Sequence, residues 1–156
     1  MFIFSNGGAV PMWQQRAGHG ETPVFWDYHV VVVVETDEAF VWDLDHRGPF
    51  PQPLHEYLKV SFPNAENWPP EARPIFRLTP SKDYRAKFSS NRAHMMDEQG
   101  HYLQPPPPWD VIVQSNEGDW MDALDRADPS WGRVFNQAQL QCRFPSLSAS
   151  GGGGGG

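Results

Sequence analysis

His29 and the acidic residues near it are the part of this sequence whose types and spacing are best suited to chemistry. Asp27 precedes His29 by two positions, and Asp43 and Asp45 follow within the next segment of the chain. A carboxylate beside an imidazole fixes the tautomer of the ring and supports its charged form, so that the imidazole can activate a nucleophile such as a thiol. The pattern therefore indicates proton-transfer chemistry centred on His29.

Two extended segments must position these side chains. Residues 24–35 form a long β-branched run that is typical of a central strand, and residues 39–44 return as its partner after a polar turn at 36–38. With the turn centred on Asp37, Val31 lies across from Asp43, and His29 becomes a diagonal neighbour of Asp43 on the same face, about 7–8 Å away by backbone. A shift of one residue in this pairing would move Asp43 to the opposite face and separate it from His29.

The rest of the chain predicts short strands and short helices joined by long loops. Sixteen prolines in 156 residues, about one in ten, favour irregular connections. A turn at Asn6-Gly7-Gly8 predicts a hairpin between residues 2–4 and 10–15. Further strands are expected at 75–79 and 111–113, and helices at 54–62, 81–88, 119–127 and 137–144, the last capped by Asn136. This order predicts an α+β domain with a mainly antiparallel sheet flanked by short helices.

Composition limits the kind of protein. The length suits one domain, expected at residues 1–145, followed by a disordered Ser/Gly-rich tail at 146–156 to which we assign no function. A formal net charge of -7 argues against nucleic acid as a partner. The single cysteine, Cys142, cannot form a disulfide within the chain, and no apolar run reaches the roughly 20 residues of a membrane helix. We expect a protein of a reducing compartment with no membrane segment and no secretory leader.

Two other interpretations of the same residues stand beside the catalytic one. A histidine on a valine-rich strand is often a hydrogen-bonded core residue, and the large aromatic residues nearby, Trp26, Tyr28 and Trp42, are expected to build the core. The donors of a divalent metal are also present, although their spacing matches no compact ligand motif. That candidate set consists of Asp27, His29, Asp43, Asp45, His46 and His55.

Four strings of residues make the sequence recognisable. They are Trp26-Asp27-Tyr28-His29-Val30, Trp42-Asp43-Leu44-Asp45, Phe88-Ser89-Ser90-Asn91-Arg92-Ala93-His94-Met95 and Pro105-Pro106-Pro107-Pro108. From about Phe2 to about Phe144 the chain resembles the protein N-terminal glutamine amidohydrolases, cysteine hydrolases that convert an N-terminal Gln to Glu and release ammonia.

The resemblance implies a papain/transglutaminase-like domain with a Cys-His-Asp triad. His29 would be the triad histidine and Asp43 the carboxylate that orients it. In the family the nucleophilic cysteine lies ahead of the strand that Met1 to Ser5 resembles, and no residue of this sequence occupies that place. Cys142 lies near the other end of the chain, where the family does not place its nucleophile, and Arg92 and His94 match the family pattern without a physical role that we can assign.

Two accounts of the missing cysteine stay open: an active amidohydrolase represented by an N-terminally incomplete chain, which we favour, and a descendant that kept the binding cleft and lost catalysis. In either case we expect this polypeptide alone not to deamidate. The implied partners are proteins or peptides with a free N-terminal Gln, whose amino group a carboxylate such as Asp27 or Asp45 would suit. We expect no cofactor, a monomer, and a location in the cytoplasm with the nucleus as a second site; a metal-dependent hydrolase is the remaining alternative.

Overall fold

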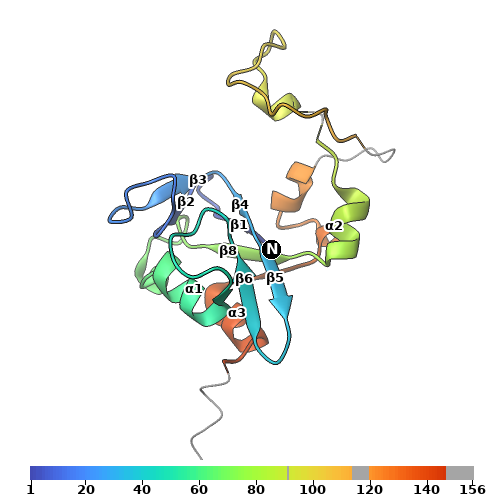
Figure 1. Cartoon of the computed structure of the whole chain (residues 1–156). Helices are drawn as coiled ribbons and strands as arrows, with labels where there is room; N and C mark the ends of the chain where they lie inside the picture. Colours follow the sequence, from blue (N-terminus) through green and yellow to red (C-terminus); the bar gives the residue numbers. More distant parts are fainter. Residues whose placement is uncertain (91, 114–119, 147–156) are drawn as a thin grey trace, which may run out of the picture. The chain divides into compact units, whose positions relative to one another are not determined.

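Figure 1 shows the computed structural model of the chain, which describes residues 1–90, 92–113 and 120–146. The chain divides into two compact units. The first consists of Met1–Leu78 and the segment from Arg133 onward, and the second consists of Thr79–Gly132. The α+β class with mainly antiparallel sheets, expected from the sequence, is confirmed.

A four-stranded antiparallel sheet lies at the centre of the first unit. Its strands are β4 (His29–Val30), β1 (Phe2–Phe4), β8 (Ile75–Leu78) and β9 (Arg133–Phe135), in that spatial order. The three residues of β1 are apolar and buried, as expected of a strand with neighbours on both sides. Ile3 pairs with His29 of β4 on one side and with Phe76 of β8 on the other. The backbone of His29 is thus held by the most buried strand of the sheet.

The hairpin predicted between residues 2–4 and 10–15 is wrong. β2 (Val10–Met12) pairs with β3 (Val24–Trp26) in a separate two-stranded sheet, while β1 pairs with β4 and β8. The glycine turn does not close onto its own strands, because the backbone N–H of Gly7 donates to the carbonyl of Glu71 instead. The fully apolar β1 is instead paired along both edges, with β4 and with β8, inside the central sheet.

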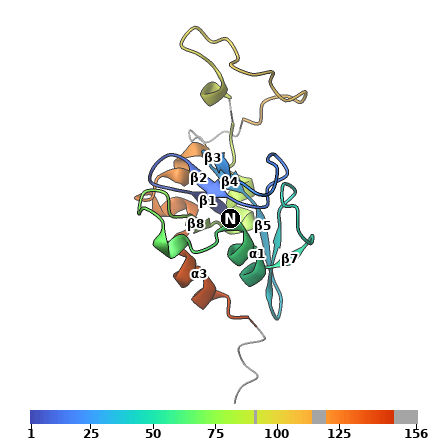
Figure 2. The ribbon, with the colours of Figure 1, turned by 90° about the vertical axis from the view of Figure 1, so that its left-hand side faces the viewer.

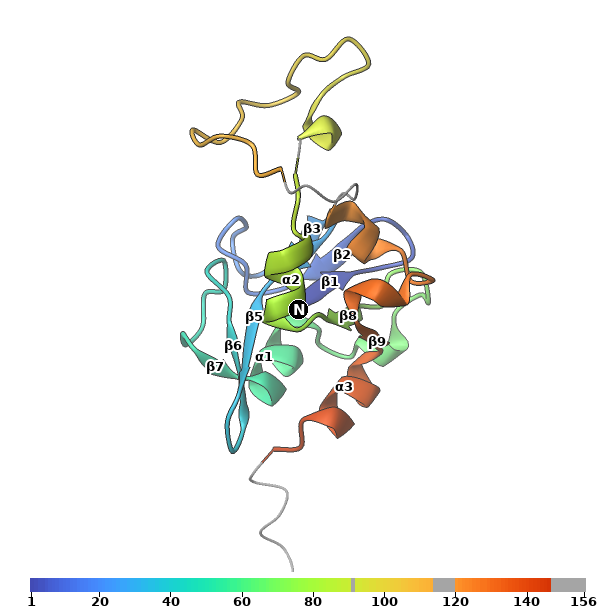
Figure 3. The same cartoon turned by 90° about the vertical axis from the view of Figure 1, so that its right-hand side faces the viewer.

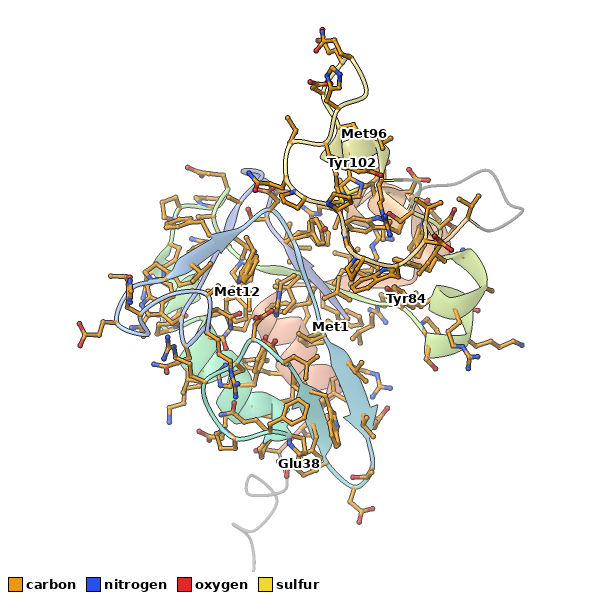
Figure 4. All side chains as sticks on the ribbon, turned by 45° about the horizontal axis from the view of Figure 1, so that its top comes forward. Met1, Met12, Glu38, Tyr84, Met96 and Tyr102 are labelled. Atoms are coloured by element: carbon orange, nitrogen blue, oxygen red, sulfur yellow. The ribbon has the colours of Figure 1, made fainter. Side chains whose placement is uncertain are left out.

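A third sheet contains β5 (Val32–Glu35), β6 (Ala39–Trp42) and β7 (Gln52–Pro53). The predicted register is confirmed, since Val32 pairs with Trp42 and Glu35 with Ala39. In Figure 4, Glu38 marks the turn between β5 and β6, and Met1 lies beside the junction of β4 and β5.

The long strand predicted at 24–35 is instead three short strands, and each belongs to a different sheet. The chain leaves the ladder at Asp27 and Tyr28 and again at Val31. Val31 is buried, and its N–H donates to the carbonyl of Met1, which accounts for the second break because it turns the backbone toward β1. The amino group of Met1 donates in return to the carbonyl of Val31, 2.7 Å away, and burial lowers the pKa of that amino group to about 6.

Two α-helices complete the first unit, with a short 3-10 turn, η1, at Ala65–Asn67. The apolar spacing that predicted a helix at 54–62 forms α1 (Leu54–Ser61), which packs against β6 and β7. The last helix, α3 (Gln137–Arg143), packs against β8 and β9, and Asn136 caps it as predicted. Figures 2 and 3 show α1 between the third sheet and α3. The core that these elements enclose includes Ile3, Val10, Met12, Val31, Val41, Leu54, Tyr57, Leu58, Phe62, Phe76 and Leu140.

The second unit contains one α-helix and three 3-10 turns among its described residues. They are α2 (Ser81–Lys87), η2 (Ala93–Met95), η3 (Trp120–Leu124) and η4 (Pro129–Trp131). The strand expected at 111–113 is reduced to a single bridge between Ser90 and Ile112, and the helix expected at 119–127 is the shorter η3. Residue 119 and the predicted tail from 147 onward lie outside the described residues. None of the helices in the described parts of the chain has the length and hydrophobicity that a membrane crossing requires.

Candidate active site

His29 and Asp43 form a buried pair. Nε2 of His29 lies 2.9 Å from Oδ1 of Asp43, and the two residues are 7% and 4% exposed. They reach each other from different sheets, because His29 is the first residue of β4 and Asp43 directly follows β6. The confirmed register between β5 and β6 keeps Asp43 on the side of the imidazole.

The hydrogen bond decides which nitrogen of His29 can move a proton. An ionised carboxylate can only accept, so Nε2–H must donate to Asp43. Nδ1 is then the basic nitrogen of the neutral ring and the one available to a nucleophile. The carboxylate thus fixes the tautomer as in a nucleophile-activating triad, but with the two ring nitrogens in the opposite roles to those of the Ser-His-Asp arrangement, in which Nδ1–H meets the carboxylate.

Trp26 holds the plane of the imidazole. Its ring stacks on that of His29 with centroids 5.3 Å apart and an angle of 24° between the planes. The indole N–H donates to Oε1 of Gln15, 3.3 Å away, and Gln15 is buried. The sequence predicts Trp26 as a packing residue only. Because the chain leaves the ladder between β3 and β4, the ring of Trp26 comes to lie on the imidazole of His29.

Three donors surround the carboxylate of Asp43. Oδ1 accepts from His29 and from the backbone N–H of Asp45, at 3.0 Å, and Oδ2 accepts from the hydroxyl of Tyr57, at 2.9 Å. Burial by itself raises the pKa of Asp43, but the hydrogen bond and charge of His29, followed by the donors from Tyr57 and Asp45, outweigh it and hold that pKa below its ordinary value of 3.8. Asp43 is therefore an anion at neutral pH.

Tyr57 is a member of the site that sequence reasoning misses. Its spacing in α1 identifies it only as an apolar core position, and no signal in the sequence links it to Asp43. The residue is fully buried, and burial together with the charge of Asp43 raises the pKa of its hydroxyl well above 10. The hydroxyl thus keeps its proton at neutral pH and donates to Asp43.

A pocket of about 380 Å³ opens beside the pair. His29, Asp43 and Asp45 form its polar side. The remaining lining residues are apolar and are at least 40% exposed: Val30, Val32, Trp42, Leu44 and Phe50. The rings of Trp42 and Phe50 meet edge to face, 5.1 Å apart, and form one wall. A small polar group can therefore reach His29 while an apolar surface surrounds it.

The six candidate metal donors are only partly brought together. Donor atoms of His29, Asp43 and Asp45 lie within 4.8 Å of one another. Asp27 is exposed and does not line the pocket, and Nε2 of His55 donates to the carbonyl of Phe144 at 2.9 Å. In the remaining set, Nε2 of His29 and Oδ1 of Asp43 already bind each other, so this arrangement suits proton transfer better than metal ligation.

His46 lies behind the pair. It is 3% exposed, and its ring centroid is 5.2 Å from that of Tyr57. Burial lowers the pKa of His46, against the opposing effects of the Asp43 charge and of the Gln52 side chain. A neutral buried imidazole in this place packs the far side of Tyr57 and does not reach the pocket.

The other residues singled out in the sequence are Arg92, His94 and Cys142. Arg92 and His94 belong to the second unit, where Arg92 donates to the carbonyl of Trp109 and His94 meets Trp120 edge to face at 5.5 Å. Cys142 is exposed on α3 and is not among the residues that line the pocket.

A carboxylate-oriented histidine at the edge of a pocket is an arrangement that can activate a nucleophile for acyl transfer. Comparison with known proteins places the chain among hydrolases that act on amide bonds. The family model described as N-terminal glutamine amidase matches residues 1–144. The chain belongs to this family.

The relatives are similar over most of their length. The protein N-terminal glutamine amidohydrolase of Bos taurus is 34% identical over 150 residues, which are 94% of this chain and 72% of the bovine protein. The corresponding human protein is 33% identical over 150 residues, 94% of this chain and 73% of its own length. The protein of that name from Drosophila melanogaster is 35% identical over 151 residues, 92% of this chain and 73% of its own length.

Proposed function

We propose that this chain supplies the histidine and the carboxylate of a protein N-terminal glutamine amidohydrolase. The observation that carries the proposal is the buried pair of His29 and Asp43 beside an open pocket. The substrate would be a protein or peptide with a free N-terminal Gln, and the products would be the same chain with an N-terminal Glu and ammonia. Membership of the family and the names of the relatives support this choice of substrate.

The chemistry follows from the tautomer of His29. Nδ1 takes the proton of a thiol, and the thiolate attacks the side-chain carbonyl carbon of Gln. The C–N bond of the amide breaks as His29 returns the proton to the leaving nitrogen, which gives ammonia and a thioester. Water then attacks the thioester carbon as one of its protons passes to His29, the C–S bond breaks, and His29 returns that proton to the sulfur, which releases the Glu product and regenerates the thiol.

The thiol of this scheme is not one of the groups at the pocket. The sequence has one cysteine, and Cys142 is exposed on α3. We therefore expect the 156-residue chain alone to release no ammonia, and we expect activity when a cysteine is presented to Nδ1 of His29. The family resemblance places that cysteine ahead of the strand at Met1–Ser5.

The test is the intact mass of a Gln-initiated peptide after incubation with two proteins. The first is this chain, and the second is this chain with a cysteine-containing segment placed ahead of Met1. We expect a gain of about one mass unit in the second sample only, lost in its His29→Ala variant and kept in its Cys142→Ser variant. Deamidation by the first sample that depends on His29 would contradict our account of the nucleophile.

Two alternatives give different results in the same experiment. A binding module that has lost catalysis would bind the Gln-initiated peptide and leave its mass unchanged in both samples. A metal-dependent hydrolase, which the proximity of His29, Asp43 and Asp45 keeps as a candidate, would lose its activity to a chelator and regain it with the metal.

Several finer features belong to the same proposal. We infer a papain/transglutaminase-like arrangement of the triad, a chain that acts as a monomer, and a location in the cytoplasm with the nucleus as a second site. The single cysteine and the net charge of -7 support a reducing compartment without nucleic acid partners.

A further inference from the structure

Within the part of the chain that the structure describes, the carboxylate of Asp45 has no partner, unlike that of Asp43. No side chain or backbone group within residues 1–90, 92–113 and 120–146 forms a hydrogen bond or an ion pair with its oxygens. Its backbone, by contrast, is fixed at both ends: the N–H donates to Asp43 at 3.0 Å, and the carbonyl accepts from the N–H of Arg16 at 2.6 Å. A rigidly placed anion therefore faces the pocket with its full accepting capacity free.

The other two carboxylates nearby, those of Asp43 and Asp27, do not present free oxygens to the pocket. Both oxygens of Asp43 are occupied by donors from His29, Tyr57 and the backbone of Asp45. Asp27 is exposed and does not line the pocket. The sequence alone leaves Asp27 and Asp45 as equal candidates for a cationic ligand, and the structure separates them.

The dimensions of the pocket fit a ligand with a polar group at each end of a short carbon chain. A carboxylate oxygen of Asp45 lies within 4.8 Å of a ring nitrogen of His29. In an extended Gln residue about 5 Å separates the α-nitrogen from the side-chain carbonyl carbon. A ligand whose carboxamide lies beside His29 can therefore place its ammonium group at hydrogen-bonding distance, about 2.8 Å, from Asp45.

We propose that Asp45 binds the α-ammonium group of the substrate and so restricts the reaction to Gln at the N-terminus of a chain. This inference rests on the proposed function, of which it names the specificity-determining residue. An internal Gln has a neutral amide in place of the ammonium group and would leave Asp45 unpaired in a partly buried position, which disfavours its binding.

The experiment compares a Gln-initiated peptide with its N-acetylated form, with binding to the 156-residue chain measured by titration calorimetry. The free amine should bind at least about tenfold more tightly than the acetylated peptide, since a hydrogen bond between two charged groups is lost on acetylation. Asp45→Asn should bind both peptides equally, Asp45→Glu should restore part of the preference, and Asp27→Asn, the matched control outside the pocket, should keep all of it.

Every outcome decides between the two proposals. Equal binding of the two peptides by the unmodified chain, or no binding of either, overturns the role of Asp45 even where a variant fails to fold. Deamidation that is indifferent to acetylation and to Asp45→Asn also refutes it and leaves the amidohydrolase function standing. Binding that needs both the amine and Asp45, without deamidation by the cysteine-extended protein, supports Asp45 and refutes the proposed function.

Discussion

Replacing Tyr57 with Phe removes one buried hydroxyl and tests the hydrogen-bond network of the site. Oδ2 of Asp43 has the Tyr57 hydroxyl as its donor, at 2.9 Å, whereas Oδ1 keeps the donors from His29 and Asp45 in the variant. The ring itself stays, and so does its edge contact with Phe62 at 6.5 Å. The cost of the substitution is therefore the loss of one hydrogen bond to a buried anion.

A hydrogen bond to a charged group contributes about 1.5–3 kcal/mol to stability. We expect Tyr57→Phe to lower the free energy of unfolding by about 2 kcal/mol at pH 7, which is about a 30-fold change in the folding equilibrium. The pKa of Asp43 should also rise toward 3.8, because one of the groups that lowers it is gone. Asp43 stabilises the fold at pH values above its unfolded pKa, and this stabilisation is lost as the pH falls through the lower folded value. The difference between the two proteins should therefore shrink toward about 1 kcal/mol at a pH low enough to protonate Asp43 in the folded protein.

Urea unfolding at both pH values measures this difference, with Tyr102→Phe as the control at a tyrosine that is 39% exposed. A double-mutant cycle with Asp43→Asn should assign most of the energy to the pair. The reasoning is refuted by a loss of less than about 0.5 kcal/mol at pH 7, or by energies that are additive in the cycle.

Three further predictions concern the surroundings of the site. Burial lowers the pKa of His46, so between its folded pKa and 6.5 the unfolded chain binds more protons than the folded one. In that range the free energy of unfolding should rise with pH by up to about 1.4 kcal/mol per unit. Unfolding at pH 5.5 and 6.5 should show a smaller rise in His46→Gln, and an equal rise would contradict this prediction. A Cβ on Gly48 would lie 2.7 Å from Nε2 of His46. Gly48→Ala should therefore lower the free energy of unfolding by about 1–3 kcal/mol in the same assay. A variant as stable as its parent would show that the imidazole of His46 moves freely. Asn136→Ala removes the capping box of α3 and should lower the melting temperature through a loss of about 1 kcal/mol of stability. Asn136→Asp can still accept from the N–H of Gln139 and should melt near the parent. Equal melting of all three proteins would exclude the cap as a source of stability.

Local patterns in the sequence determined the elements whose signals are short in range. The apolar period of residues 54–62 sufficed for α1, and Asn136 sufficed for the N-cap of α3, whereas the reciprocal bond from Gln139 was seen only in the structure. The polar turn at 36–38 determined the register of β5 and β6, because a strand that buries one face tolerates no shift by one residue. The sequence therefore predicts the pairing of His29 with Asp43, but in the structure the two residues meet from different sheets, so the β5–β6 register alone does not bring them together.

The tertiary structure decided which strands pair and which side chains complete the site. Pairing between strands distant in sequence depends on competition for the central positions of a sheet, and this competition placed β1 between β4 and β8 and divided residues 24–35 among three sheets. The division brought Trp26 onto the imidazole and left the carboxylate of Asp45, and not that of Asp27, facing the pocket. Tyr57 reached Asp43 through the packing of α1 on β6, a contact that the apolar period of the helix does not encode. Periodicity specifies the face of an element that is buried, and only the folded chain specifies the group that this face meets.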